Sequence, residues 1–490
     1  WSDPPNRIRD LFMRTTLLAA SMLALAACAT APTNSTTTAS SDPRAGEAEF
    51  RALYKELIEI NTTLSVGSCT KASEAMKARL VAAGYPESDL HILVNPKPNR
   101  PQDGNLVAIL PGTDPSLKAI LLMAHIDVVE AKREDWVRDP FKLTEEDGFF
   151  YARGASDDKS MAAIFTDSMI RFKREGYKPA RTIKLMLNCG EESPNEFVGA
   201  QYMVQEHLDL ISAGFALNEG AGGRIDPDTG KYVFNGVQAG EKLYQDFTLE
   251  ITNPGGHSSR PVPDNAIYRL GAALTKIQSL EFPIEFNDAT IGFFKRMGEL
   301  TPGQEGQDMR DAAGGENAAA IRRLMLNPGY NALFHTTCVA TQLTAGHAPN
   351  ALPQRATANV NCRIFPGRTQ EEIQKQLITA INDSDIKVTM QSDPEKPGAP
   401  PRLTPEILGP IEKITEQVFP GVPVVPAMAT GATDGRFTTP AGIPTYGVSG
   451  IFADPNTSGT HGLNERVGVK QLYDGRVFLH LLVKEYAGGK

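Results

Sequence analysis

An apolar run that ends in a histidine and an aspartate constrains the fold of this chain most. Residues 119–123 are all apolar, which is typical of a central strand covered on both faces. His125 and Asp127 follow this run, and they can meet because residues two apart on a strand point the same way. Two interpretations stand at this point: a structural His–Asp pair that caps the strand, or a metal site with a carboxylate behind the histidine.

Two further apolar strands are followed by acidic residues in the same way. The runs at 182–188 and 214–217 predict strands, and a helical pattern at 161–175 precedes them. Strands that alternate with helices predict a largely parallel sheet, in which sites form beyond the carboxyl ends of the strands. We therefore expect the acidic residues after these strands and before this helix to converge on His125. They are Asp157, Asp158, Glu191, Glu192 and Glu219.

The pattern changes after residue 241. Segments from 244 to 391 follow the order strand–helix–strand–strand–helix–strand, which predicts a small α+β domain of the ferredoxin-like type. Residues 290–330, rich in glycine and charge, interrupt this order as an insertion. We predict an α/β fold in which a larger domain with a mainly parallel sheet carries this smaller domain as an insertion. The expected ranges are 1–44 for a signal and tether, 45–242 and 396–490 for the larger domain, and 243–395 for the smaller one.

The expected cluster of acidic groups requires cations. Several carboxylates in one apolar pocket repel one another and raise each other's pKa unless positive charge neutralises them. Two histidines and three carboxylates suit two zinc ions that share one bridging carboxylate. Such paired ions polarise a carbonyl and activate water, and a remaining glutamate can act as general base. Glu191 and Glu192 alone would fit a solvated turn, but their place after a buried strand favours a site.

Six short motifs, spread in order between about residues 50 and 490, resemble the dizinc aminoacylase and carboxypeptidase family. This family includes acetylornithine deacetylase, succinyl-diaminopimelate desuccinylase, glutamate carboxypeptidase and aminoacylase-1. Glu219 stands where some members have aspartate, which resembles the aminoacylase and carboxypeptidase branch, and Ser160 stands where many have glycine. The motifs are Met-Ala-His125-Ile-Asp127-Val-Val, Tyr-Ala-Arg-Gly-Ala-Ser-Asp157-Asp158-Lys, Gly-Glu191-Glu192, Leu-Asn-Glu219-Gly, Pro-Gly-Gly-His257-Ser and Thr-His461-Gly.

The resemblance implies a catalytic role for each matched residue. Asp157 would bridge two zinc ions, with His125 and Glu219 completing one site and Glu192 and His461 the other. Asp127 would orient His125, and Glu191 would be the general base. We expect Asp158 to shape the loop beside Asp157 and assign it no metal. His257 would stabilise the oxyanion, in its own site or in that of a partner subunit. A loop histidine that only stabilises a turn is the alternative for His257.

The resemblance also implies substrate contacts and a partner. Asn350 and Arg363 match positions that hold a substrate carboxylate, for which arginine is well suited, although Arg363 also fits a surface strand residue. The loop from Gly431 to Gly435 would add backbone contacts. The smaller domain resembles the family's lid, through which we expect a homodimer.

The amino-terminal segment predicts export. Arg14 is followed by an uncharged, mostly apolar run at 15–27 that is too short to span a bilayer. Cys28 ends a Leu-Ala-Ala-Cys sequence that resembles a bacterial lipobox, in which the cysteine is lipidated; an ordinary cleaved signal peptide is the alternative. Residues 29–41 read as a flexible tether. We expect a periplasmic lipoprotein, on the outer membrane rather than the inner one, held only by its lipid anchor.

Charge and cysteine usage narrow the remaining choices. The net charge of −9 argues against nucleic acid or an anionic membrane surface as the main partner. Cys338 and Cys362 lie in two strand-like segments, where they either form a disulfide or remain as buried thiols. The expected function is zinc-dependent cleavage of an amide bond next to a free carboxylate in short peptides. The alternatives are an N-acyl-amino-acid deacylase and a binding lipoprotein without catalysis.

Overall fold

A computed structural model describes Asp42, residues 44–192, 197–392, Lys396, and residues 398–454 and 457–489. The predicted signal segment, the tether and Cys28 lie outside these described residues. None of the helices in this described part combines the length and apolar character that a membrane span requires.

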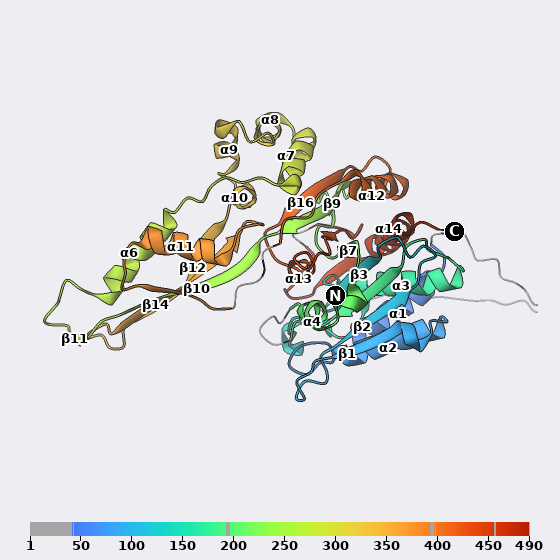
Figure 1. The fold of residues 1–490 in the computed structure, drawn as a ribbon, viewed down its shortest axis with the longest axis horizontal. Helices are drawn as coiled ribbons and strands as arrows, with labels where there is room; N and C mark the ends of the chain where they lie inside the picture. The colour runs from blue at the N-terminus through green and yellow to red at the C-terminus, as the bar shows by residue number, and fades with distance from the viewer. Residues whose placement is uncertain are drawn as a thin grey trace, which may run out of the picture. The chain divides into compact units, whose positions relative to one another are not determined.

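A ten-stranded sheet forms the centre of the larger domain (Figure 1). Its order is β1-β2-β6-β3-β7-β17-β9-β8-β18, with β16 paired to β9. The central strands β6, β3, β7 and β17 run parallel, which confirms the predicted mainly parallel α/β fold. The strands are β1 (Leu90–Val94), β2 (Gly104–Leu110), β3 (Ile120–His125), β6 (Ile183–Asn188), β7 (Phe215–Asn218), β8 (Gly223–Ile225), β9 (Tyr232–Glu241), β16 (Val424–Ala429), β17 (Thr445–Gly447) and β18 (Phe452–Ala453).

Helices cover both faces of this sheet, which explains why β3 is apolar at every position before His125, its last residue. Ile120 and Leu122 belong to the core shared with the helices of one face, and Leu121 and Met123 to the core under the other. The first face carries α1 (Glu47–Glu59), α2 (Cys69–Ala82), α3 (Lys159–Arg174), α12 (Pro405–Val418) and α14 (Val469–Ala487). The second carries α4 (Gly199–Glu206), α5 (Leu208–Ile211) and α13 (Gly435–Thr438). Short 3-10 turns lie at Glu87–Asp89 and Arg133–Asp135.

A small three-stranded sheet joins two distant parts of the chain. It consists of β4 (Thr144–Glu146), β5 (Phe149–Tyr151) and β19 (Arg466–Gly468), with β5 in the middle. Tyr151 is paired with Arg466, so the loop after β5 lies beside the loop before β19. The sequence pattern did not predict this sheet, because three-residue strands carry too little periodicity to recognise.

The inserted domain has a four-stranded antiparallel sheet in the order β12-β14-β10-β15. Two helices share its buried core, α6 (Ala266–Gln278) and α11 (Gln370–Ile381), so the predicted ferredoxin-like order is present. The strands are β10 (Leu243–Thr252), β12 (Thr337–Ala345), β14 (Arg355–Ile364) and β15 (Lys387–Met390). A separate two-stranded ribbon pairs β11 (Gly256–His257) with β13 (Ala351–Leu352).

Four helices occupy the predicted insertion between α6 and β12. They are α7 (Asp288–Leu300), α8 (Gly303–Ala312), α9 (Ala318–Leu324) and α10 (Pro328–Phe334). Phe294 and Phe334 stack with ring centroids 4.5 Å apart, and both belong to the core of the larger domain. The insertion therefore packs with the larger domain, although the chain reaches it from the smaller one.

Two disulfides connect the described elements. Cys338–Cys362 joins neighbouring positions of β12 and β14, so the first of the two alternatives for this pair holds in the structure. Cys69–Cys189 joins the first residue of α2 to the residue after β6. This second pair could not be predicted from the sequence, because its two cysteines come together only through the packing of α2 beside the sheet.

Candidate metal centre

Five side chains predicted as metal ligands lie together beyond the carboxyl ends of the central strands. His125 is the last residue of β3, Glu219 follows β7, and Glu192 lies shortly after β6. Asp157 and His461 come from the two loops that the small sheet places side by side, before α3 and before β19. The parallel arrangement thus brings together residues that are more than 300 positions apart in the chain.

The carboxylate of Asp157 lies between the two histidines. Its Oδ1 is 2.9 Å from His125 Nε2, and its Oδ2 is 3.2 Å from His461 Nε2. His461 Nε2 is also 2.9 Å from Glu192 Oε1, and His125 Nε2 is 3.8 Å from Glu219 Oε2. Each oxygen of Asp157 therefore faces a different imidazole, which is the arrangement that a carboxylate bridging two metal ions requires.

The main chain orients His125. Its Nδ1 lies 3.0 Å from the carbonyl oxygen of Asp127, and because a carbonyl only accepts, Nδ1 donates and Nε2 faces the cluster. The carboxylate of Asp127 has a different role. It lies 3.7 Å from Nδ1 and accepts hydrogen bonds from the backbone amides of Glu191 (3.3 Å) and Glu192 (3.0 Å). Asp127 thus fixes the turn that carries the predicted general base.

The electrostatics of the cluster fit bound cations. Burial raises the pKa of Glu191 to about 8 and the pKa of Glu219 well above its usual range. The hydrogen bond to Asp157 and the one to Glu192 raise the pKa of His461 to about 10. Burial alone would lower the pKa of His125, but the carboxylates around it raise the value well above normal. Without metal, each histidine must hold a proton on Nε2 to face these carboxylates, and two metal ions would take the places of these two protons.

Asp158 also belongs to the cluster, although we did not expect from the sequence that it binds a metal ion. It is buried, and its Oδ2 has no hydrogen-bond partner in the part of the chain that the structure describes. One oxygen of Asp158, one of Glu219 and a ring nitrogen of His125 all lie within 4.8 Å of one another. An unpaired buried carboxylate oxygen is costly, so its position supports the presence of a cation at this end of the cluster.

His257 ends β11 of the β11–β13 ribbon, and Asn350 immediately precedes β13. His257 is exposed and its Nδ1 accepts a hydrogen bond from the Ser259 amide at 3.2 Å, while the Asn350 carbonyl accepts one from the Ser258 amide at 3.0 Å. Within the described ranges no contact joins either residue to the metal ligands. The structure therefore does not bring these two predicted residues into the site.

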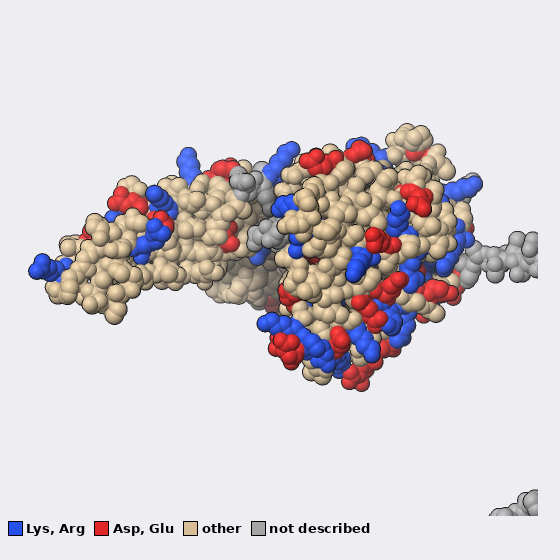
Figure 2. Space-filling view, turned by 90° about the horizontal axis from the view of Figure 1, so that it is seen from below, with Lys and Arg blue, Asp and Glu red and all other residues tan. Residues whose placement is uncertain are grey.

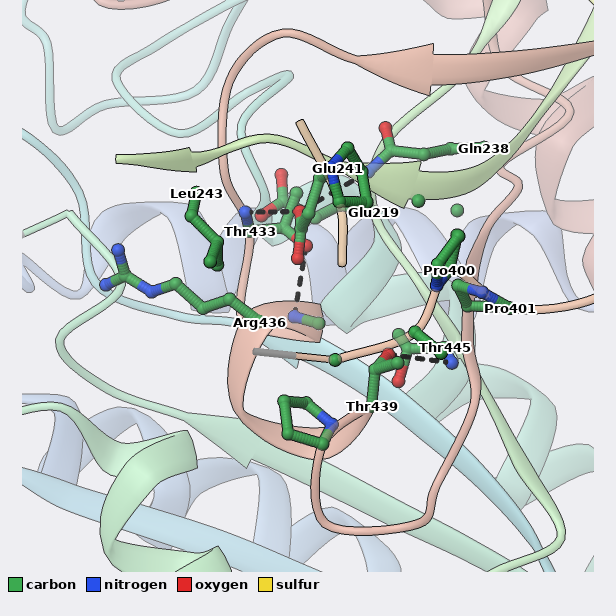
Figure 3. A pocket seen from close by; sticks show the side chains of 17 residues that line it. Glu219, Gln238, Glu241, Leu243, Pro400, Pro401, Thr433, Arg436, Thr439 and Thr445 are labelled. Carbon is green, nitrogen blue, oxygen red and sulfur yellow. Dashed lines mark hydrogen bonds between the residues drawn. The ribbon is translucent and has the colours of Figure 1, made fainter. Parts of the chain in front are cut away.

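The other predicted substrate residues lie nearer the domain junction. The Arg363 guanidinium on β14 lies over the Tyr244 ring, 4.7 Å from its centroid. Gly435 begins α13 and lines a narrow cavity of about 40 Å³ that also reaches Glu219 (Figure 3). Gly431 is exposed and does not line this cavity. In the same view, the Thr433 amide donates to the half-buried Glu241 carboxyl group at 2.7 Å, and this bond connects the 431–435 loop to the end of β9.

A larger cavity of about 350 Å³ opens beside the cluster, where Asp157, Asp158 and Glu219 form part of its wall. This volume is within the usual range for small-molecule sites. Hydroxyl groups dominate the polar part of the lining, and the residues that carry them are Ser156, Ser160, Ser449, Ser458 and Thr460. Met161, Phe234 and Ile451 supply apolar wall, so the cavity is of mixed character.

Two residues that hold the site were not predicted. Glu465 is buried and bonds the loop of Asp157, and Arg153 bonds both Glu465 and the loop of His461. Arg153 lies inside a matched motif, and Glu465 follows His461 by four residues, so their positions were visible in the sequence. Their role was not visible, because it depends on the pairing of β5 with β19.

Comparison with known proteins decides the family. The model of peptidase family M20/M25/M40 matches residues 121–485, which contain every predicted metal ligand. The chain belongs to this family. It is therefore a hydrolase of amide bonds of the metallopeptidase class, as the motifs implied.

Relatives and solved structures agree with this assignment. The human N-fatty-acyl-amino acid synthase/hydrolase PM20D1 is 30% identical over 382 residues, which cover 75% of this chain and 73% of that protein. Mouse aminoacylase-1 is 26% identical over 74% of this chain and 79% of its own length. The M20 family metallo-carboxypeptidase Sso-CP2 from Sulfolobus solfataricus has the same fold, with a TM-score of 0.67 at 17% identity over 90% of this chain and 99% of that one.

Proposed function

We propose that this M20 hydrolase is a dizinc exopeptidase that cleaves the amide bond next to the free carboxylate of short peptides. The observation that carries the proposal is the Asp157 carboxylate between His125 and His461, each oxygen facing one imidazole. Glu192 and Glu219 complete a set of two nitrogen and three carboxylate ligands, which suits zinc.

Side chains of the protein supply the remaining catalytic and binding roles. When bound, the two zinc ions would polarise the scissile carbonyl and lower the pKa of water. Glu191 would take a proton from the attacking water and give it to the leaving nitrogen, and so would serve as general base and then as general acid. Its backbone amide is held by Asp127, so its carboxylate stays beside the cluster without being a ligand. Arg363 would hold the free carboxylate of the substrate, for which a guanidinium is well suited.

The larger cavity supports short peptides as the substrates. Its five hydroxyl-bearing residues can exchange hydrogen bonds with peptide groups, and Arg224 lines it as well. A long hydrocarbon chain would offer the polar groups of this cavity no hydrogen bonds in exchange for the water that it displaces.

An N-acyl-amino-acid deacylase is the second candidate. The relatives at 30% and 26% identity carry the names of an N-fatty-acyl-amino acid synthase/hydrolase and an aminoacylase. The two reactions share one chemistry, since both cleave an amide bond next to a free carboxylate. They differ only in the group on the carbonyl side, which the larger cavity would receive.

We also propose that the protein is a lipoprotein anchored through Cys28 on the periplasmic face of the outer membrane. The lipobox-like sequence supports this location. The two disulfides also support it, because disulfides persist in oxidising compartments. Metabolic labelling with a radioactive fatty acid tests the proposal: label should enter the wild-type protein and be absent from Cys28→Ser, and label in Cys28→Ser would overturn it.

Purified protein tests the proposed activity when zinc content is measured together with hydrolysis of a dipeptide panel and an N-acetyl amino acid panel. We expect about two zinc ions per chain and faster cleavage of dipeptides. Glu191→Gln should keep both ions and lose at least 100-fold in kcat, whereas Glu371→Gln on α11 should behave as wild type. Faster cleavage of N-acetyl amino acids would favour the deacylase. Bound metal without turnover of either panel would favour a binding lipoprotein, and absence of metal would contradict the site.

A further inference from the structure

Glu465 lies at the junction of the two loops that supply Asp157 and His461. It immediately precedes β19, and β19 pairs with β5, from which the Asp157 loop leaves. Its side chain is only 1% exposed. Burying a carboxylate is costly unless hydrogen bonds and a counter-charge compensate for the lost hydration. The contacts of Glu465 therefore indicate its role.

Each oxygen of Glu465 holds a different part of the Asp157 loop. Oε1 accepts hydrogen bonds from the backbone amides of Ser156 (2.8 Å) and Asp157 (3.0 Å). Oε2 accepts from the Gly154 amide at 2.9 Å. Gly154 has φ of 79°, and a Cβ there would lie 2.7 Å from Val128 Cγ1, so only glycine allows this amide to reach the carboxylate. One side chain thus fixes three amides within the four residues up to Asp157.

Arg153 extends this connection to the other loop. Its Nη1 donates to Glu465 Oε2 at 2.7 Å, and its Nη2 donates to the carbonyl of Gly462 at 2.8 Å, the residue next to His461. The guanidinium is 3% exposed and lies 5.1 Å from the centroid of the Trp136 ring. A rigid planar group therefore spans the two loops, and a single-point cation such as lysine cannot make both bonds.

We propose that Glu465 is a positioning residue that, through Arg153, sets the separation of Asp157 and His461 and thereby the affinity for the metal ion these two residues share. The inference rests on the proposed function, because it takes both residues as ligands. Glu465 itself touches neither metal nor substrate. Outer groups of this kind commonly change metal affinity or activity by 10–100-fold when they are replaced.

The test compares full-length wild type, Glu465→Gln and a matched control for zinc affinity and for kcat against added zinc. Glutamine keeps the shape but turns one acceptor into a donor, which must then face either Arg153 and the Gly154 amide or the other two amides. We expect the more weakly held zinc ion to dissociate at least 10-fold more readily, and excess zinc to restore most of kcat. The control is Asp167→Asn, another buried carboxylate that accepts from an arginine, Arg476, at 2.8 Å.

Asp167→Asn should lower the melting temperature while both zinc affinities stay within twofold of wild type. Unchanged zinc affinity in Glu465→Gln, or an equal loss in both variants, would overturn the inference. If Glu465→Gln does not fold, Arg153→Lys gives the same decision, because it keeps the charge but loses one of the two loop contacts. A wild-type protein without zinc would overturn the proposed function as well, whereas two zinc ions bound with equal affinity by wild type and Glu465→Gln would remove the positioning role alone.

Discussion

At the scale of single residues, the role of a predicted residue depends on its contacts with the backbone. The sequence predicted four ligands of the cluster because His125, Glu192 and Glu219 come at the ends of recognisable strands and Asp157 precedes a helix. His461 was predicted from its motif alone. It assigned the orientation of His125 to the Asp127 side chain, whereas the Asp127 carbonyl makes that contact and its carboxylate holds two amides instead. Residue spacing shows which side chains share a face, but not which atom of a residue is used.

Replacement of Asp127 by asparagine separates these two roles. Asp127→Asn keeps the carbonyl contact to His125, so we expect two metal ions to remain bound. It weakens the hydrogen bonds that fix the Glu191 turn, and kcat should fall by about 10–100-fold. Metal content and kcat measured on the same sample check the prediction, and loss of one metal ion would show that the carboxylate orients His125 after all.

His480 makes stability depend on pH. Burial lowers the pKa of His480 to about 4, so this histidine is neutral in the folded protein and gains a proton on unfolding at pH values below about 6.5. The unfolded state then binds more protons, and the free energy of unfolding should fall by about 1.4 kcal/mol per pH unit from this group as pH drops from 6.5 towards 4. Urea unfolding of wild type and His480→Gln at pH 7, 6 and 5 tests this slope, which the variant should lack; equal slopes would contradict it.

At the scale of elements, the sequence pattern predicted the helices and strands that are long enough to show a period. The strand before His125 and the helices at 161–175 and 405–418 carry enough apolar periodicity to be recognised, and they are present as β3, α3 and α12. The β4–β5–β19 sheet was missed because its pairing joins residues 149–151 to 466–468, and neither segment is long enough to show a pattern. The long-range contacts of Arg153 and Glu465 depend on that sheet, so they could not be predicted either.

The two disulfides should stabilise the fold to different extents. Cys69–Cys189 closes a loop with a sequence separation of 120 and Cys338–Cys362 one of 24, so the chain-entropy model gives the first about 1.4 kcal/mol more stabilisation. Denaturant unfolding of the two paired Cys→Ser variants measures the difference. A larger loss from Cys338 and Cys362 would contradict the prediction and would indicate that local packing between β12 and β14 dominates.

At the scale of the whole molecule, the surface carries charge of both signs. Lys and Arg side chains are interspersed with Asp and Glu on the face that Figure 2 shows, and the net charge of the whole chain is −9. One edge strand of the smaller domain's sheet carries exposed apolar residues instead of charged ones. On β12, Val339 is 60% and Leu343 62% exposed, and apolar residues on an edge strand favour pairing with another chain.

We therefore expect a homodimer that forms through β12. Wild-type protein should elute as a dimer in size-exclusion chromatography with light scattering, and the double variant Val339→Lys with Leu343→Lys should elute as a monomer, because charge on an edge strand opposes pairing. Ile378→Lys on α11, also an exposed apolar residue of the smaller domain, serves as the control and should remain a dimer. A monomeric wild type, or a dimeric double variant, would contradict this expectation.

The central claim is that Asp157 bridges two metal ions. Crystals of the zinc-loaded protein measured at the zinc absorption edge test it most directly. We predict two anomalous peaks about 3.5–4 Å apart, one on each oxygen of Asp157, with His125 at one and His461 at the other. A single peak, or two peaks of which only one contacts Asp157, would contradict the account of the site.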